Sequence, residues 1–228
     1  MANQRQKADR KPRKIRVMVV DDHPIVRQGV RLTLNQERDM EVCCEAETAA
    51  AALAAMKAEI PTIAVVDLTL KGRSGLDLIK DLLAIRRDLP ILVLSVHDEA
   101  LYAERSLRAG ARGYVVKHEA ARQVVKAIRR ILGGDIFVSD SVATKLLSRF
   151  SRTREVATEE SPVSRLSDRE LEILDRIGQG QGTRSIAESL GLSVNTVETH
   201  RAHIKTKLQI ETAAELARFA VEWRLNSR

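Results

Sequence analysis

The sequence predicts an α/β fold: a flavodoxin-like, doubly wound parallel sheet of five strands, followed by a small all-α domain of four helices with a helix-turn-helix. Short Val-, Ile- and Leu-rich runs alternate with longer segments of helical periodicity, which is typical of βαβ units whose strands are buried on both faces. Beyond a polar stretch at residues 151–164, only helical patterns remain. We therefore expect two domains joined by a linker.

The first domain contains five strand candidates that alternate with five helix candidates. The strands are expected near residues 15–20, 40–46, 62–66, 91–95 and 113–116, and the helices near residues 23–37, 48–58, 75–87, 98–109 and 119–132. Five such units suit the strand order 2-1-3-4-5, with a topological switch point between the first and third strands. Ligands of these sheets bind at the carboxyl ends of the strands, beside that point.

The second domain is expected to begin with a helix at Ser167, because Ser167 and Glu170 have the spacing of a capping box. A second helix ends near Gly191, and a third follows over residues 194–208, which is the plan of a helix-turn-helix. A helical wheel gives this third helix an apolar side and a narrow, small-sided face suited to a DNA major groove. The apolar side consists of Val194, Val197, Ile204 and Leu208, and the opposite face of Asn195, Thr199, Ala202 and Thr206.

The net charge of +7 is concentrated in the N-terminal tail. Residues 1–16 contain seven basic residues and one acid, residues 17–162 contain 21 of each, and residues 163–228 contain ten basic and nine acidic residues. Both a disordered solubilising extension and a nucleic-acid-binding arm fit the tail. The expected organisation is a basic tail at residues 1–14, a folded domain at 15–133, a linker with a short helix at 134–164, and the helix-turn-helix domain at 165–228.

The cysteines and the hydropathy profile indicate an intracellular chain. The only two cysteines, Cys43 and Cys44, are adjacent in an expected strand, where successive side chains point to opposite faces. They predict two reduced structural thiols and neither a disulfide nor a metal site. No segment approaches the roughly 18 uninterrupted apolar residues of a membrane span, and the N-terminus lacks an apolar signal core. We therefore expect a cytoplasmic protein with no membrane partner.

Polar residues with the chemistry for accepting and sensing a phosphoryl group follow four of the expected strands. Asp21 and Asp22 follow the first strand, Asp67 the third and Lys117 the fifth, and Ser95 stands at the end of the fourth. Because these strand ends meet at one edge of the sheet, we expect the five side chains to converge on one crevice. Crowded carboxylates favour a hard divalent cation with oxygen ligands, such as Mg²⁺.

These five residues, together with Gly75 and Tyr114, make residues 15–132 resemble the receiver domain of two-component response regulators. Residues 163–226 resemble the LuxR-type helix-turn-helix. The motifs that carry this second resemblance are residues 166–170, 186–187 and 193–208. The combination is similar to the NarL/FixJ class of response regulators and covers nearly the whole chain.

The first resemblance implies that Asp67 is a nucleophile that accepts a phosphoryl group from a sensor histidine kinase. Asp22, the Asp67 carboxylate and the backbone carbonyl of Thr69 would hold Mg²⁺, with Asp21 assisting through water. Lys117 would help to stabilise the transferred group.

The resemblance also implies a switch at the end of the fourth strand. The phosphoryl group would draw the Ser95 hydroxyl toward it, and Tyr114 would swing into the space that Ser95 leaves. This movement would change the surface of the fourth and fifth strands and of the helices after them.

The second resemblance implies sequence-specific binding to double-stranded promoter DNA. Base contacts would come from Glu198, Thr199 and Ala202, with Asn195 on the same face. The residues expected to neutralise phosphates are Arg184, Arg201, Lys205 and Lys207. Because the domain carries a charge of only +1, a homodimer on DNA is expected. The last helix either forms that dimer interface, as in the family, or packs within its own domain, and RNA polymerase is a further candidate partner.

Two alternative functions stay open. A phosphohydrolase that forms an aspartyl-phosphate needs a second acid two residues after the nucleophile, and this chain has Thr69 there. A DNA-binding regulator that works without phosphorylation would not need the complete set of acids and lysine. We therefore expect a phosphorylation-controlled regulator and not an enzyme. Lys71 and His118 stand where the family often has proline, which leaves the phosphorylation lifetime and the choice of kinase open.

Overall fold

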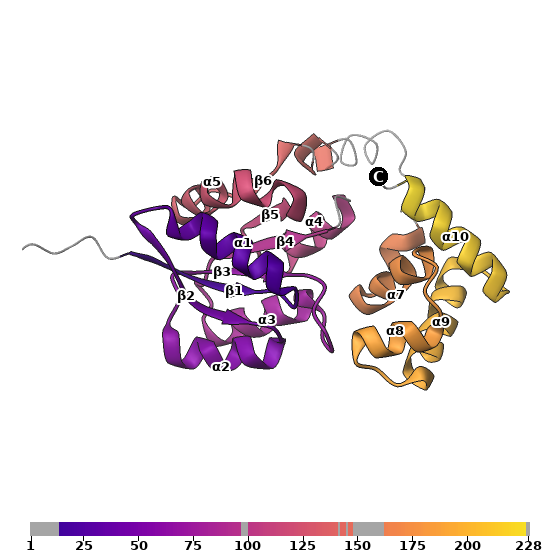
Figure 1. Ribbon diagram of the computed structural model, residues 1–228. Coiled ribbons are helices and arrows are strands. Elements are labelled where there is room, and N and C mark those ends of the chain that lie inside the picture. Colours follow the sequence, from indigo (N-terminus) through magenta and orange to yellow (C-terminus); the bar gives the residue numbers. More distant parts are fainter. Residues whose placement is uncertain (1–13, 97–99, 141, 145, 148–161, 227–228) are drawn as a thin grey trace, which may run out of the picture.

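A computed structural model describes residues 14–96, 100–140, 142–144, 146–147 and 162–226. An N-terminal α/β domain stands beside a C-terminal helical domain (Figure 1). The basic tail expected at residues 1–14 lies outside the described residues except for Lys14, and the segment 148–161 of the expected linker lies wholly outside them. In the part of the chain that is described, no helix combines the length and the apolar character that a membrane span requires.

The N-terminal domain is built on a parallel sheet in the order β2-β1-β3-β4-β5-β6. Its strands are β1 (Ile15–Val20), β2 (Met40–Ala46), β3 (Ile63–Asp67), β4 (Ile91–Ser95), β5 (Gly113–Val116) and β6 (Phe137–Val138). The order of the first five strands confirms the predicted doubly wound sheet. The short β6 is an addition that falls inside the expected linker, and it pairs with β5 through Gly113 and Tyr114. Two residues are too few to give a periodic signal in the sequence.

Helices cover both faces of this sheet (Figure 1). Helices α1 (Pro24–Asn35) and α5 (Ala120–Leu132) pack on one face, and α2 (Ala49–Glu59), α3 (Gly75–Ile85) and α4 (Ala100–Arg108) pack on the other. In β1, Val17 and Val19 belong to the first core, and Met18 and Val20 belong to the second. Burial on both sides explains why these strands read as continuous apolar runs.

Strand β2 contains an irregularity that the sequence did not indicate. Val17 pairs with Val42, whereas Met18 pairs with Cys44, so Cys43 is the extra residue of a β-bulge. The bulge reverses the alternation of the strand: Val42 packs against the core of α1 and α5, and Cys44 packs against the core of α2 and α3. The expectation that Cys43 and Cys44 point to opposite faces is therefore wrong, because it assumed a regular strand.

The C-terminal domain consists of a short 3-10 turn and four α-helices. They are η2 (Pro162–Arg165), α7 (Asp168–Gly178), α8 (Thr183–Leu190), α9 (Val194–Leu208) and α10 (Ala213–Asn226). The predicted capping box is present, with both hydrogen bonds between Ser167 and Glu170. Gly191 ends α8 with a φ of +62°, a left-handed conformation that glycine adopts without steric cost.

The predicted faces of α9 are largely confirmed. Val197 and Ile204 are fully buried, and the face opposite to them is exposed. Val194 was expected on the buried side but is 44% exposed, because it is the first residue of the helix and extends beyond the neighbours that bury the later turns. Helix α10 packs on α7 through Leu216 and Ala220, which are fully buried.

Candidate functional site

Asp21, Asp67 and Lys117 come together at the carboxyl ends of β1, β3 and β5, where the sequence predicts a crevice. Asp67 ends β3 and is 1% exposed. The Lys117 Nζ atom lies 2.7 Å from Oδ2 of Asp67 and 2.7 Å from Oδ2 of Asp21, so one ammonium joins two carboxylates. Among the described residues, the buried Oδ1 atom of Asp67 has no hydrogen-bond partner. The nucleophile expected from the sequence thus has one oxygen held and one oxygen open to a ligand.

Burial is the largest single influence on the pKa values of Asp67 and Lys117. Loss of hydration raises the pKa of Asp67 to about 6, although the Lys117 ammonium opposes this shift. Burial alone would lower the pKa of Lys117, but the charges of Asp67 and Asp21 outweigh that effect and raise it. Lys117 therefore stays protonated at neutral pH, while Asp67 is the group that changes charge in a mildly acidic solution.

The acids also fit a divalent cation. Asp21, Asp22, His23 and Asp67 each offer a ligand atom, and these atoms lie within 4.8 Å of one another. Carboxylate oxygens with an unsatisfied buried Oδ1 suit a hard ion such as Mg²⁺ better than a soft one. Thr69 lies in the loop after β3 and forms an isolated bridge with Ser74.

Two residues near the acids had no role in the sequence analysis. His23 places Nδ1 2.7 Å from Oδ1 of Asp22, and its backbone N–H donates a 2.8 Å hydrogen bond to Asp21. Arg27 is buried in α1 and donates a 2.6 Å hydrogen bond from Nη1 to the backbone carbonyl of Asp21. Both brace the loop that carries the acid pair. The only sequence signal for this is their place at the start of the following helix, where His23 is the N-cap and Arg27 lies in the first turn.

Gly75 has a steric role beside the nucleophile. A Cβ atom at this position would lie 2.1 Å from the carbonyl oxygen of Asp67, which no side chain permits. The Gly75 N–H donates a 2.8 Å hydrogen bond to the carbonyl of Leu68. Glycine thus lets α3 begin directly against the end of β3 and fixes the loop between them.

The two residues expected to form the switch lie next to this crevice and are buried. Ser95 ends β4 and is fully buried, and it lies opposite Val116 in the register with β5. Tyr114 lies two pairs earlier, opposite Val93, and is also fully buried. The tyrosine ring is therefore already inside the domain in this conformation, whereas the predicted switch has it move inward.

The exposed face of α9 carries all the expected base-reading side chains. Asn195, Glu198, Thr199 and Ala202 are exposed. Glu198 accepts a 2.6 Å hydrogen bond from Thr183 of α8, so the first helix of the helix-turn-helix orients this carboxylate. Among the described residues, the hydrogen bonds and the ion pair of these side chains stay within the C-terminal domain.

The basic residues expected to contact phosphates differ in whether they already lie beside a carboxylate of their own domain. Arg184 is exposed on α8, whereas the Arg201 side chain is only 16% exposed and lies 3.9 Å from Glu198. Lys207 lies 2.6 Å from the buried carboxylate of Glu170, so this lysine already joins α9 to α7. A phosphate contact by Lys207 would compete with that ion pair.

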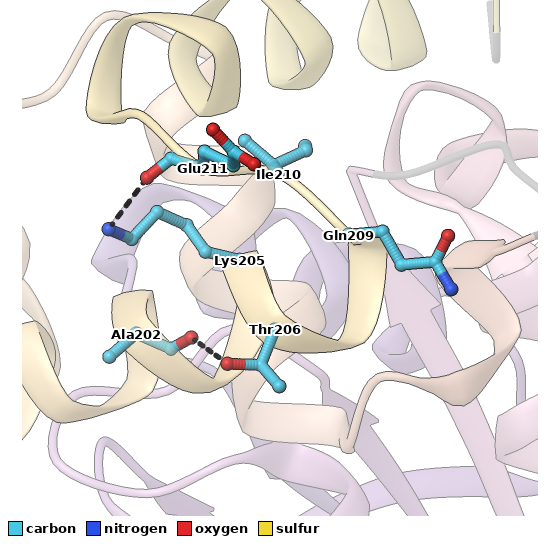
Figure 2. A pocket seen from close by; sticks show the side chains of 6 residues that line it. All are labelled: Ala202, Lys205, Thr206, Gln209, Ile210 and Glu211. Atoms are coloured by element: carbon cyan, nitrogen blue, oxygen red, sulfur yellow. Dashed lines mark hydrogen bonds between the residues drawn. The ribbon is translucent and has the colours of Figure 1, made fainter.

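A shallow hollow of about 460 Å³ lies at the end of α9 (Figure 2). Its lining residues are Ala202, Lys205, Thr206, Gln209, Ile210 and Glu211. The Lys205 ammonium points across it and donates a 3.3 Å hydrogen bond to the backbone carbonyl of Glu211, as Figure 2 shows. Among the described residues, Lys205 thus contacts a neutral group and no carboxylate, so its charge is available to an anion.

The two domains contact each other through α4 and the start of α7. Nη1 of Arg105 donates a 2.9 Å hydrogen bond to Asp168, and Nη2 donates a 2.7 Å hydrogen bond to the backbone carbonyl of Leu166. Lys80 of α3 lies 3.3 Å from the same aspartate. A Cβ atom on Gly191 would lie 3.0 Å from Cα of Gly72, so the loop after Asp67 approaches the turn between α8 and α9.

Comparison with known proteins agrees with this division into two domains. Residues 17–129 match the response regulator receiver domain, and residues 164–220 match the bacterial regulatory proteins of the luxR family. The oxygen regulatory protein NreC of Staphylococcus epidermidis is 35% identical over 215 residues, which is 92% of this chain and 99% of NreC. NreC of Staphylococcus carnosus is 34% identical over 214 residues, with 92% and 99% covered.

Solved structures give the same result. A LuxR-family response regulator from Aurantimonas has a TM-score of 0.59 at 33% identity, covering 60% of this chain and 99% of that one. The RcsB response regulator of Salmonella typhimurium has a TM-score of 0.68 at 26% identity, with 92% and 98% covered. RcsB bound to the promoter rprA in the presence of the phosphomimetic BeF₃⁻ has a TM-score of 0.63 at 26% identity, with 91% and 98% covered.

The chain belongs to the two-component response regulators that combine a receiver domain with a LuxR-type DNA-binding domain. It is a transcription regulator controlled by phosphorylation. Receiver domains as a class bind Mg²⁺, and LuxR-type response regulators bind promoter DNA.

Proposed function

We propose that Asp67 is the phosphoacceptor and that its phosphorylation by a sensor histidine kinase controls binding of this protein to promoter DNA. The observation that carries the proposal is the state of the Asp67 carboxylate. One oxygen is held 2.7 Å from Lys117, and the other is buried without a partner among the described residues. A carboxylate fixed on one side directs its free oxygen toward an incoming phosphorus atom.

Asp21, Asp22, Asp67 and the backbone carbonyl of Thr69 would hold Mg²⁺ beside this oxygen. When bound, the ion neutralises the carboxylates and the charge that develops on the phosphoryl oxygens. Lys117 supplies a second positive charge from the opposite side of the carboxylate, and burial strengthens that interaction. His23 orients Asp22 through the 2.7 Å contact of its Nδ1 atom.

The signal would then pass from Asp67 to α4. The added phosphoryl group carries roughly −1.5 to −2 charges and draws the hydroxyl of Ser95 and the ammonium of Lys117 toward itself. Tyr114 lies on β5, which contacts α4, and Ser95 lies on the neighbouring strand β4. Because Arg105 of α4 holds the C-terminal domain, a shift of this helix changes the contact between the domains.

On DNA, Asn195, Glu198, Thr199 and Ala202 would read base edges in the major groove. Arg184, Arg201 and Lys205 would contact phosphates. Lys207 would do so only after releasing Glu170.

Helix α10 supports a homodimer on DNA. Its outer face carries a stripe of exposed apolar residues with the four-residue spacing of one helix face, namely Ala213, Ala217, Val221 and Leu225. A solved relative, RcsB, is described as two dimers bound to two DNAs, with a TM-score of 0.56 at 26% identity. RNA polymerase is a further proposed partner at promoters.

The test of the phosphoacceptor is labelling of the purified full chain by radiolabelled acetyl phosphate. We expect an acid-stable, base-labile label that needs Mg²⁺, is abolished by Asp67→Asn, and does not form when EDTA is present during the labelling. Asp22→Asn should reduce the label, whereas the exposed Asp135→Asn should not change it. An equal yield of label from wild type and Asp67→Asn would overturn the assignment.

A further inference from the structure

Cys43 and Cys44 form a pair of thiols on one side of the sheet edge. The bulge at Cys43 brings the two Sγ atoms to 3.8 Å, although the residues are adjacent in a strand. β2 is the outermost strand in the order β2-β1-β3-β4-β5-β6, and both side chains are partly exposed. These are the only cysteines in the chain, so any thiol chemistry of this protein takes place here.

The surroundings activate one thiol of the pair. A hydrogen bond from Cys44, assisted by the neighbouring Arg16 guanidinium, lowers the pKa of Cys43 to about 7. The same hydrogen bond raises the pKa of Cys44. The Val17 carbonyl, 3.5 Å from Sγ of Cys43, accepts a hydrogen bond while that thiol is protonated. Near pH 7 Cys43 is therefore partly ionised while Cys44 keeps its proton, and the remaining thiol protons are released when an electrophilic ion binds.

We propose that Cys43 and Cys44 are a vicinal dithiol site that chelates a soft, thiophilic metal or metalloid ion. Two sulfur atoms 3.8 Å apart and each about 2.3 Å from an ion subtend an angle of about 110° at it, which is close to tetrahedral. Thiolate sulfur selects soft ions over Mg²⁺ and Ca²⁺. The site therefore differs in chemistry from the carboxylate crevice around Asp67.

The same geometry disfavours a disulfide. Adjacent Cα atoms are about 3.8 Å apart across a trans peptide, whereas disulfides join Cα atoms separated by about 4.4–6.8 Å. Closing an S–S bond of about 2.05 Å would therefore strain the strand, while chelation leaves the sulfur atoms where they are.

A trivalent organoarsenical is the most direct probe, because it binds two thiols and needs no other protein ligand. Phenylarsine oxide reacts with both S–H groups to form two As–S bonds. Its oxygen leaves as water with the two thiol protons, so no oxidant or reductant is required.

The experiment is intact mass spectrometry of the full-length protein after incubation with one equivalent of phenylarsine oxide. We expect one adduct per chain with loss of one water. Excess 2-mercaptoethanol should remove this adduct at least tenfold more slowly than it removes the adduct of Cys43→Ser or Cys44→Ser, and dithiothreitol should remove it readily. Far-UV circular dichroism and the thermal unfolding midpoint check that the variants are folded.

A matched variant tests whether retention of the arsenical needs the bulge or only the presence of two cysteines. Val42→Cys combined with Cys43→Val keeps two thiols, but residues 42 and 44 pack in opposite cores. This variant should release the arsenical as fast as a single-cysteine variant. Absence of an adduct on the wild type, release from the wild type as fast as from the single-cysteine variants, or retention by the displaced pair would each overturn the proposal.

Discussion

Arg105 in α4 donates a 2.9 Å hydrogen bond to the carboxylate of Asp168, the first helical residue of α7, and thereby connects the receiver domain to the DNA-binding domain. The arginine also donates to the backbone carbonyls of Ser164 and Leu166, at 3.3 and 2.7 Å. Its side chain is 12% exposed, so these bonds are shielded from solvent more than a surface ion pair is. A change in the position of α4 therefore changes these hydrogen bonds to the start of the DNA-binding domain.

Removal of the Arg105 side chain should weaken the contact between the two domains. We expect Arg105→Ala to increase the radius of gyration of the unphosphorylated protein, as measured by small-angle X-ray scattering, because four hydrogen bonds to the other domain are lost. Arg108→Ala is the matched control, since Arg108 lies one turn further along α4 and, within the described residues, pairs with Glu104 of the same helix. Equal scattering from both variants would show that Arg105 does not restrain the domains.

Asp67 should make the stability of the protein depend on pH. Its folded-state pKa of about 6 exceeds the usual value of 3.8, so the folded protein keeps a proton that the unfolded chain loses between about pH 4 and pH 6. The free energy of unfolding of the wild type should therefore fall as the pH rises from about 4 to about 6. Asp67→Asn should remove this loss and be more stable at pH 7 by about 1–3 kcal/mol, with little difference at pH 4.

Chemical denaturation in EDTA at several pH values measures this difference, because bound cations would otherwise offset the repulsion between the acids. A constant difference between wild type and Asp67→Asn from pH 4 to pH 7 would contradict the assigned burial effect.

Lys205 and Lys207 should behave differently although both were expected to contact phosphates. Lys207→Ala breaks the pair with Glu170 and should lower the free energy of unfolding by about 1 kcal/mol, a modest value because Lys207 is partly exposed. Lys205→Ala should leave stability within about 0.5 kcal/mol but weaken DNA binding and reduce the salt slope by about 1. A changed salt slope with unchanged stability for Lys207→Ala would instead make Lys207 a phosphate contact.

Glu198 should determine base preference. Removal of its carboxylate takes away the acceptor for a cytosine amino group, so Glu198→Ala should relax discrimination at one base pair by about 1–3 kcal/mol. Selection from a randomised DNA library measures this preference. Arg184→Ala is the comparison, because a phosphate contact should weaken all sequences alike. The same uniform loss for Glu198→Ala would argue against direct readout.

The order of the first five strands and the convergence of their polar ends could be predicted from the sequence, because burial on both faces and the parallel topology leave few arrangements. The contact of Lys117 with Asp67 follows from that topology alone. The β-bulge at Cys43 could not be predicted, since one extra residue in a short strand leaves no periodic trace. It reverses the face of every later residue in β2, which is why the prediction for the two cysteines was wrong.

The contact of Arg105 with Asp168 could not be predicted from the sequence either. An arginine on the polar side of α4 has the same pattern as any solvated charge, and its partner depends on how two domains meet. Val194 illustrates the limit of a helical wheel, because the wheel gives the direction of a side chain but not the end of the neighbouring helices. The roles of His23 and Arg27 depend similarly on the loop that returns to Asp21.

The most direct measurement of the central claim is the affinity of the full chain for a promoter fragment with and without phosphorylation. Fluorescence anisotropy should be recorded at fixed salt, on a fragment selected from genomic DNA by the protein itself, for wild type and Asp67→Asn with and without acetyl phosphate and Mg²⁺. We expect acetyl phosphate to tighten wild-type binding by about tenfold, or about 1.4 kcal/mol, and to leave Asp67→Asn unchanged. Equal responses of the two proteins, or no response of a wild type shown to be phosphorylated, would contradict control of DNA binding through Asp67.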